Sequence, residues 1–530
     1  MAADALWQSA DFYPSVASDR RRLHLPLWAL EAEWVASFAG MAPRDEFYLC
    51  GGGKQRADDG KPLVESLTER HHELFAATRG DTRRLQRALS ASDGVTVAAI
   101  GSSNVVRGGC HAWQNTKCSL DPRYKGGWLL RFFAFLNQTW PHPNNVLVNH
   151  ARMATGPEYF LPCVNRAVPD TADLVVIGFG EFCDLQNPLS NRPSSYALNT
   201  TNWFAAAIEG IIATLRRRAD PPSILLWNIH KWTRPAGCIA APYTSFARVL
   251  RRRGPPLCDY FQSCDQDLAA IASYHFVSSV SLRNAFYADA HCPSAPLHWS
   301  RWTIDGGGHL NSQGDALVGA LTGRWLRDVS SRPSLAAAPL RQPLLAGPFA
   351  DATQRPALCF SFDDTFVEVP HNFGVPHRYQ AQAPQLARPS ECFMESTQQS
   401  THGALNKSGL VCTRRGACVV LNTTVRAPLR ARLGFLASPR SRAEAEISCT
   451  AGCTCPLRRA ISLQQGSSTL REVGFDASMT RRPSPMARPI GADLADSCLI
   501  QLCSLIDGER FKLISLTVEL PAALDYHGTA

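Results

Sequence analysis

The sequence lacks a long, uninterrupted apolar run. Its most apolar early stretch, residues 23–42, contains His24, Pro26, Glu31 and Glu33. These side chains make the stretch too polar to cross a bilayer as one helix. We therefore expect no transmembrane segment.

Basic clusters with interleaved aromatic side chains, which are typical of nucleic-acid-binding surfaces, are also lacking. The net charge of +9 includes arginine clusters at residues 20–22, 216–218 and 251–253, and no aromatic residue interrupts them. Such clusters favour a solvated surface. We expect no nucleic-acid partner.

Cysteine or histidine pairs at zinc-ligand spacing do not stand out either. Cys449, Cys453 and Cys455 form the tightest cluster, but no second pair at zinc spacing lies nearby. The eighteen cysteines are an even number and mostly lie far apart, which is typical of a protein from an oxidising compartment. We expect disulfides, and neither a metal nor a cofactor.

The first ten residues lack the charged start and the apolar run of a signal peptide. Four N-glycosylation sequons, at Asn137, Asn199, Asn406 and Asn422, nevertheless fit a glycoprotein of the secretory pathway. We expect a lumenal or extracellular protein whose true start is missing from the sequence.

A chain of 530 residues is too long for one core, so several domains are expected. Residues 1–92 show no site signal and are interpreted as an N-terminal extension or cap. From Val95 onward, apolar runs of strand length alternate with amphipathic segments, which predicts a parallel sheet covered by helices over residues 93–329. The expected strands and helices are residues 95–100, 145–149, 174–178, 224–228 and 276–281, and residues 128–136, 203–217, 265–274 and 312–327, respectively.

Residues 330–350 are rich in proline, alanine and serine and are interpreted as a linker. In residues 351–530, short β-rich runs such as 418–425 and 511–520 alternate with turns and cysteines. This pattern predicts a smaller, disulfide-stapled β-sandwich domain.

The first candidate for chemistry is a turn at the end of the first expected strand. After residues 95–99, the segment Ile100-Gly101-Ser102-Ser103-Asn104 replaces strand-forming residues with glycine and small polar ones. A buried strand that ends in such a turn can present a hydroxyl at the carboxyl edge of a parallel sheet. An ordinary strand-to-loop exit is the alternative.

The second candidate is the loop from Asp305 to His309, just before the last expected helix. If this loop lies beside Ser103, the imidazole can take the hydroxyl proton while Asp305 orients the ring. In the alternative interpretation, Asp305 caps local structure and His309 caps the helix that follows.

Glycines after two other strands are candidates for an oxyanion hole. Gly156 follows the second expected strand, and Gly180 follows the third. A backbone donor in an oxyanion hole is worth about 3–4 kcal/mol of barrier. Turn geometry alone can also explain both glycines.

In their order along the chain, these segments resemble the blocks of the SGNH (GDSL-like) hydrolase superfamily, over about residues 94–328. Segment 271–283 is similar to the helix-strand pair of algal and plant members. The matching blocks are Gly101-Ser102-Ser103 for Gly-Asp-Ser, Gly156 for the second-block glycine, Gly180 to Asp184 for Gly-x-Asn-Asp, and Asp305 to His309 for Asp-x-x-His.

The resemblance implies a flavodoxin-like α/β/α sandwich and a serine esterase. Ser103 would be the nucleophile, with His309 and Asp305 completing a triad. The oxyanion hole would be formed by Ser103, Gly156, Gly180 and the position of Cys183. With the secretory features, this implies O-acyl, most simply acetyl, esters of carbohydrate. A carbohydrate O-acyltransferase and a non-catalytic cell-surface or glycan-binding protein are the alternatives.

Two positions depart from the family pattern. Phe182 and Cys183 stand where the third block has its oxyanion asparagine, so Asn187 or Asn104 would have to replace that amide. Without it, the rate would fall by about 10²-fold or more. Three residues instead of two separate Asp305 from His309, and the glycines between them would permit the extra bulge.

Overall fold

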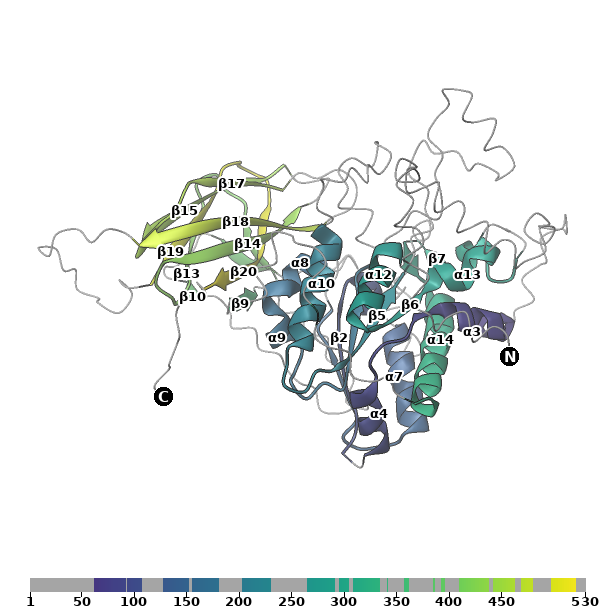
Figure 1. Cartoon of the computed structure of the whole chain (residues 1–530). Helices are drawn as coiled ribbons and strands as arrows, with labels where there is room; N and C mark the ends of the chain where they lie inside the picture. The colour runs from purple at the N-terminus through teal and green to yellow at the C-terminus, as the bar shows by residue number, and fades with distance from the viewer. Residues whose placement is uncertain are drawn as a thin grey trace, which may run out of the picture. The chain divides into compact units, whose positions relative to one another are not determined.

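The computed structural model describes about half of the chain, in segments of both expected domains (Figure 1). All the described strands lie in one compact unit formed by residues 61–287 and 299–530. The described residues are 62–91, 93–106, 127–151, 155–180, 203–229, 265–290, 295–304, 308–333, 341, 357–361, 385–386, 392–395, 409–437, 442–462, 469–479 and 497–520.

The α/β domain is built on a six-stranded sheet. Its strand order is β1 (Ala76–Thr78), β6 (Ser278–Ser281), β5 (Ser223–Asn228), β4 (Leu174–Gly178), β2 (Thr96–Gly101) and β3 (Val146–Asn149). Only β1 is antiparallel to its neighbour; β2 to β6 are parallel. Numbered along the chain, the parallel strands have the order 2-1-3-4-5, the flavodoxin-like order. The predicted fold class is confirmed.

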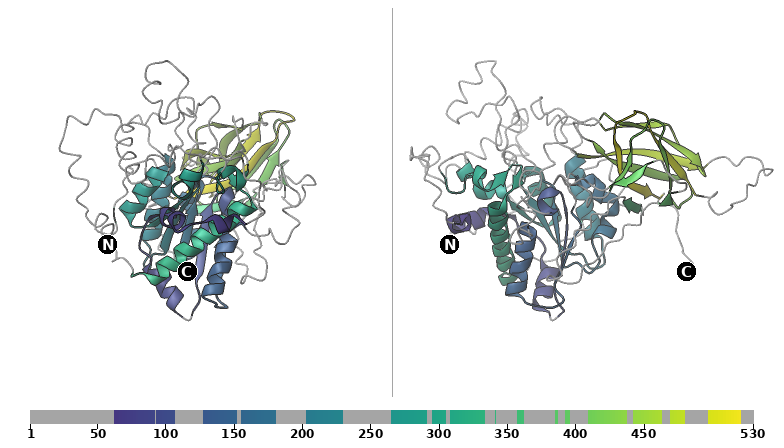
Figure 2. Two further views of the ribbon diagram at one scale, coloured as in Figure 1. Left: turned by 90° about the vertical axis from the view of Figure 1, so that its right-hand side faces the viewer. Right: turned by 180° about the vertical axis from the view of Figure 1, so that it is seen from behind.

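Helices cover both faces of this sheet, and Figure 2 shows the three layers. Val175 and Ile177 of β4 share a core cluster with Ile208 and Ile211 of α10. Their neighbours along β4 point to the opposite face, where Trp128 of α7 stacks on Trp227 of β5 with ring centroids 4.4 Å apart. The helices are α8 (Pro157–Phe160), α9 (Val164–Ala167), α10 (Trp203–Arg216) and α12 (Asp265–His275) on the first face, and α7 (Trp128–Thr139) and α14 (Ser312–Ser331) on the second. Since β4 is buried along its whole length, its sequence is a continuous apolar run.

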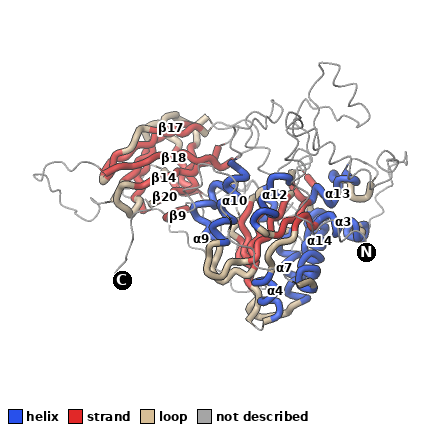
Figure 3. Tube along the Cα trace, viewed as in Figure 1, coloured by secondary structure: helices blue, strands red, loops and turns tan. Residues whose placement is uncertain are grey.

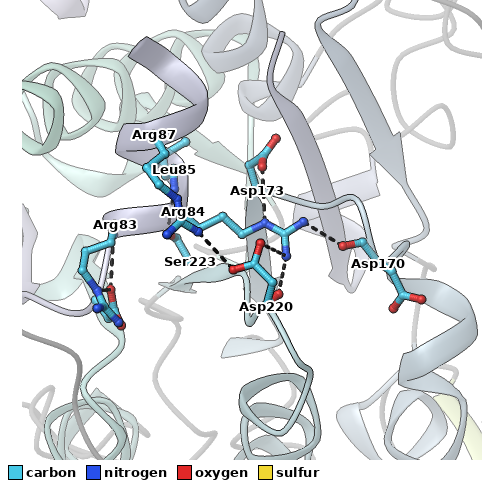
Figure 4. Close-up of polar contacts among 9 residues, drawn as sticks. Arg83, Arg84, Leu85, Arg87, Asp170, Asp173, Asp220 and Ser223 are labelled. Carbon is cyan, nitrogen blue, oxygen red and sulfur yellow. Dashed lines mark hydrogen bonds and ion pairs between the residues drawn. The ribbon is translucent and has the colours of Figure 1, made fainter. Parts of the chain in front are cut away.

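Residues 62–91, which the sequence analysis assigned to an extension, contribute elements to the α/β domain. They form η3 (Leu63–Ser66), α3 (Glu69–Phe75), β1 and α4 (Arg83–Ser90), and β1 pairs with β6. Arg84 of α4 donates to the carbonyl oxygen of Asp170 at 2.7 Å and to the Asp173 carboxylate at 3.3 Å (Figure 4). These bonds attach α4 to the segment that enters β4. A three-residue strand has too little pattern to be recognised in advance.

The C-terminal described segments form two antiparallel sheets, shown in red in Figure 3. Their inner faces share one core that includes Val419, Leu502, Leu433 and Phe475. One sheet has the order β10 (Gln385–Leu386), β13 (Cys418–Asn422), β19 (Leu499–Ser504), β15 (Glu444–Ala451) and β17 (Arg458–Ile461). The other has the order β11 (Phe393–Glu395), β12 (Gly409–Cys412), β20 (Phe511–Glu519), β14 (Leu429–Ala437), β18 (Thr469–Met479) and β16 (Cys453–Thr454), with β9 (Ala357–Ser361) also on β20. The predicted β-sandwich is confirmed.

Five disulfides lie among the described residues, as the cysteine content predicts. The Cys449 cluster forms disulfides and not a zinc site, because Cys449 pairs with Cys455 and Cys453 with Cys498. Two others, Cys392–Cys412 and Cys418–Cys503, also lie within the β domain. The fifth joins Cys163, after α8, to Cys359 of β9. In the described segments, no helix is both long and apolar enough to cross a membrane.

Candidate active site

Ser103 lies in a strand-turn-helix at the carboxyl edge of the sheet. Strand β2 ends at Gly101, and the Ser102 amide donates to the carbonyl oxygen of Gly178 at 2.9 Å. The short helix α5 (Ser103–Val106) begins immediately afterwards. Because β2 and β4 are the neighbours at which the strand order reverses, Ser103 stands where flavodoxin-like folds bind their ligands.

Two glycines let this turn fold back on the sheet. Gly101 and Gly178 are direct partners across β2 and β4. A Cβ atom on Gly101 would lie 2.6 Å from Cγ2 of Val105, and one on Gly178 would lie 2.5 Å from the same atom. Side chains at either position would therefore push α5 away from the strands and displace Ser103.

His309 lies near the C-terminal end of the α/β domain in sequence, but the fold places it at the same edge of the sheet as Ser103. It begins β8 (His309–Leu310), which pairs with β7 (Thr303–Ile304). Its Nε2 lies 2.9 Å from Oγ of Ser103. The two side chains are 206 residues apart in sequence, and the fold brings them within hydrogen-bond distance.

Asn311, and not His309, caps the helix that follows. Its side chain accepts hydrogen bonds from the amides of Gln313 and Gly314, at 2.9 and 3.0 Å. The alternative interpretation of His309 as a helix cap is therefore wrong. The imidazole is instead placed against the candidate nucleophile.

Asp305, Phe182, Cys183 and Asn187 lie outside the described residues. Their assigned or suggested parts in the site stay predictions.

The other oxyanion candidates follow strands that flank Ser103. Gly156 is the residue before α8 on the segment that follows β3, and Gly180 comes two residues after β4. A Cβ atom on Gly156 would lie 2.3 Å from a carboxylate oxygen of Glu158, and one on Gly180 would lie 2.2 Å from Oδ1 of Asn228. A side chain at Gly156 would require the Glu158 side chain to move, whereas one at Gly180 would also meet the backbone carbonyl oxygen of Ile229 at 2.7 Å.

The Ser103 amide already has a hydrogen-bond acceptor in this structure. It donates to Oγ of Ser102 at 2.6 Å. Ser102 is fully buried and stands where the resembling family has aspartate. For this amide to bind an oxyanion, its hydrogen bond to the Ser102 hydroxyl has to break.

Asn104 does not serve as the replacement oxyanion donor. It is fully buried, and its amide nitrogen donates to the carbonyl oxygen of Gly308 at 3.2 Å. Its Oδ1 accepts the amide of Leu310 at 3.1 Å. The side chain is directed at the backbone around His309, so it cannot contact a substrate. The sequence suggested Asn104 only as a replacement oxyanion donor, and its contacts with the backbone around His309 were not predicted.

A buried polar cluster lies beside Gly180 at the end of β5. Asn228 donates to the Asp265 carboxylate, and Nε of Arg283 lies 3.6 Å from its other oxygen. Asn228 and Asp265 are both buried. Since a buried carboxylate is stabilised by charged and polar partners, this cluster supports the backbone under Gly180.

No protein-family model matches the sequence, and no curated protein matches it. Among solved structures, the chain is similar to a two-domain esterase active on acetylated mannans, co-crystallised with mannopentaose, at 14% identity and a TM-score of 0.49, covering 84% of this chain and 97% of that one. It is also similar to a variant of an acetyl-xylooligosaccharide esterase from Geobacillus, at 14% identity and a TM-score of 0.31, covering 47% of this chain and 100% of that one. A GDSL-like lipase from Parabacteroides merdae has 13% identity and a TM-score of 0.31, covering 44% and 97%. The strand order of the sheet, and not these similarities, identifies the flavodoxin-like fold.

Proposed function

We propose that the protein is a serine esterase that hydrolyses O-acyl esters. The observation that carries this proposal is the 2.9 Å distance between Oγ of Ser103 and Nε2 of His309 at the carboxyl edge of the sheet. A serine hydroxyl beside an imidazole is the pair that acyl transfer requires, because the ring takes the proton as the oxygen attacks.

The reaction proceeds in two steps. Oγ of Ser103 attacks the ester carbonyl while Nε2 of His309 takes its proton, and His309 returns that proton to the departing alkoxide. The acyl group is then bound to Ser103. Water, deprotonated by His309, attacks this ester and releases the carboxylic acid and the free serine. Asp305 has the proposed role of orienting the ring.

The negative charge of the tetrahedral intermediate needs hydrogen-bond donors. We assign this part to the amides of Ser103 and Gly156, with Gly180 and the position of Cys183 completing the hole. Each donor lowers the barrier by about 3 kcal/mol. A cysteine thiol is a weaker donor than an amide, so the enzyme is expected to be slower than one with asparagine there.

The proposed substrates are small O-acyl, principally acetyl, esters of carbohydrate outside the cytosol. The five disulfides among the described residues support an oxidising compartment, and the esters proposed as substrates there are those of glycans or lipids. Acetylated mannans, on which the two-domain esterase named above is active, are suitable first probes. If a sugar hydroxyl replaces water in the second step, the same acyl-enzyme transfers its acyl group.

Ser103→Ala tests the proposal. Wild-type protein should hydrolyse p-nitrophenyl acetate and release acetate from acetylated mannan, and a fluorophosphonate probe should label it. In Ser103→Ala the labelling should disappear and the rate should fall by at least about 10³-fold, because no nucleophile remains. Ser90→Ala, at the end of α4 and exposed, is the matched control and should behave as wild type.

Equal, background-level labelling and hydrolysis in the wild type and in Ser103→Ala would contradict the esterase. That result would favour a non-catalytic protein on the same fold. Acetyl transfer to added oligosaccharide, with little free acetate, would indicate the acyltransferase.

A further inference from the structure

The side chain next to the nucleophile holds the backbone on both sides of His309. Asn104 donates to the carbonyl oxygen of Gly308, and the amide of Leu310 donates to its Oδ1. One amide group therefore contacts the residue before His309 and the residue after it. Asn104 directly follows Ser103. Its two hydrogen bonds therefore connect the turn that holds Ser103 to the backbone that holds His309, and neither bond involves Oγ of Ser103 or the imidazole.

Asn104 is itself held in place by a second residue. Nε1 of Trp128 donates to the carbonyl oxygen of Asn104 at 2.9 Å. The Trp128 amide donates to the Asp315 carboxylate at 3.1 Å, and Asp315 lies in the first turn of α14. Since α14 begins just after Leu310, the contacts form a closed ring through α5, β8, α14 and α7.

The ring is shielded from water. Asn104 and Trp128 are 0% exposed and Asp315 is 2% exposed. A buried polar group that loses its partner costs about 1–3 kcal/mol. A shift of the His309 hairpin would break both Asn104 bonds where no water can replace them, so the ring opposes such a shift.

We propose that Asn104 is a positioning residue that sets the distance between Ser103 and His309, and that Trp128 orients Asn104. The inference deepens the proposed esterase function and rests on it. Asn104 cannot touch a substrate because it is fully buried. Its loss should therefore act on the chemical step and leave substrate binding nearly unchanged.

Asn104→Ala should lower kcat by about 10²-fold, the effect of a misplacement of about 1 Å. KM should stay within about twofold, because the contacts to substrate remain. Trp128→Phe keeps an aromatic ring against Trp227 but removes the bond to the Asn104 carbonyl, so a smaller fall, of about tenfold, is expected.

The matched control is Asn145→Ala. Asn145 is also a buried amide with three hydrogen bonds, to the Val95 amide, Asn137 and the Trp140 carbonyl oxygen. It lies at the amino end of β3, at the sheet edge opposite to Ser103. It should lose comparable thermal stability and keep the wild-type kcat when assayed below its melting temperature.

Hydrogen exchange of the Leu310 amide tests the ring without any substrate. This amide donates to Asn104, so it should be protected in the wild type and in Asn145→Ala and exchange at least about tenfold faster in Asn104→Ala. Protection of the Leu310 amide in a wild type that hydrolyses nothing, with loss of that protection in Asn104→Ala, would refute the esterase but support the ring. An active Asn104→Ala with wild-type kcat would overturn the positioning role. Should Asn104→Ala not fold, an unprotected Leu310 in the wild type, or a wild-type kcat in Trp128→Phe, would overturn it.

Discussion

The nucleophile turn depends on the absence of side chains as much as on the serine. Gly101 and Gly178 leave room for Val105, and Val105 in turn keeps α5 close to the strands. In a parallel sheet with large aliphatic neighbours, two adjacent glycines cost strand stability. In this protein, the two glycines allow α5, and with it Ser103, to lie close to the edge of the sheet.

Gly178→Ala should displace Ser103. The new Cβ would lie 2.5 Å from Cγ2 of Val105 and 3.1 Å from Trp227, so α5 must move. We expect a loss of about 1–3 kcal/mol in the free energy of unfolding and a fall in kcat of about 10²-fold, measured by urea titration and ester hydrolysis. Adding Val105→Ala should restore part of the activity.

Gly474→Ala is the control for this change. Gly474 also lies in a strand, β18, but its nearest neighbour to a new Cβ would be 3.8 Å away. Full activity in Gly178→Ala, or an equal loss in Gly474→Ala, would show that the close approach of α5 is not what places Ser103.

At the scale of elements, β1 is the edge strand of the six-stranded sheet, and α4 precedes the first parallel strand of the α/β domain. Asp81 links them: it accepts hydrogen bonds from the Arg83 side chain at 2.7 and 2.9 Å and from its amide at 3.2 Å. Burial raises the pKa of Asp81, but the Arg83 hydrogen bonds and the charges of Arg83 and Arg216 outweigh it and hold the pKa below its ordinary value.

Asp81→Asn should therefore destabilise the protein in a pH-dependent way. A carboxylate with a lowered folded pKa adds stability above its unfolded pKa of about 3.9, and the contribution disappears as the pH falls through the folded value. Urea unfolding at pH 7 should show a loss of about 1 kcal/mol, and the difference from wild type should shrink toward pH 3. Asp476→Asn, at an exposed carboxylate, should show neither effect. A constant difference across this range would contradict the link.

The elements with strong patterns were predictable, and the contacts between them were not. Expected strands 174–178 and 224–228 match β4 and β5 to within one residue, because buried parallel strands have continuous apolar runs. The Gly-Ser turn and the acid-histidine loop indicated Ser103 and His309. The ring through Asn104 and Trp128 had no signal, since hydrogen bonds between residues 206 apart leave no spacing to recognise.

At the scale of the whole molecule, a disulfide joins the α/β domain to the β domain. Cys163 and Cys359 are 196 residues apart, and Ile514 of β20 belongs to the same core cluster as α10. In the chain-entropy model, a disulfide that closes a longer loop removes more freedom from the unfolded chain. This bond should therefore matter more to stability than the local ones.

Replacing both Cys163 and Cys359 by alanine should lower the free energy of unfolding by about 2 kcal/mol more than replacing Cys392 and Cys412, whose loop spans 20 residues. Unreduced, denatured wild type should show at most the eight thiols that lie outside the five disulfides. Eighteen reactive thiols would refute the oxidised state and the secretory compartment, and equal losses in the two double variants would refute the loop-length effect.

Ser103 follows the first parallel strand, and His309 precedes the last helix of the domain. During synthesis, about two hundred residues are therefore added after Ser103 before His309 is made. No fragment ending before the β7–β8 hairpin can hold the reacting pair. If the protein is the proposed esterase, reactivity of Ser103 toward a fluorophosphonate would therefore report that the α/β domain has folded as far as the β7–β8 hairpin, and a chain truncated before that hairpin would not react.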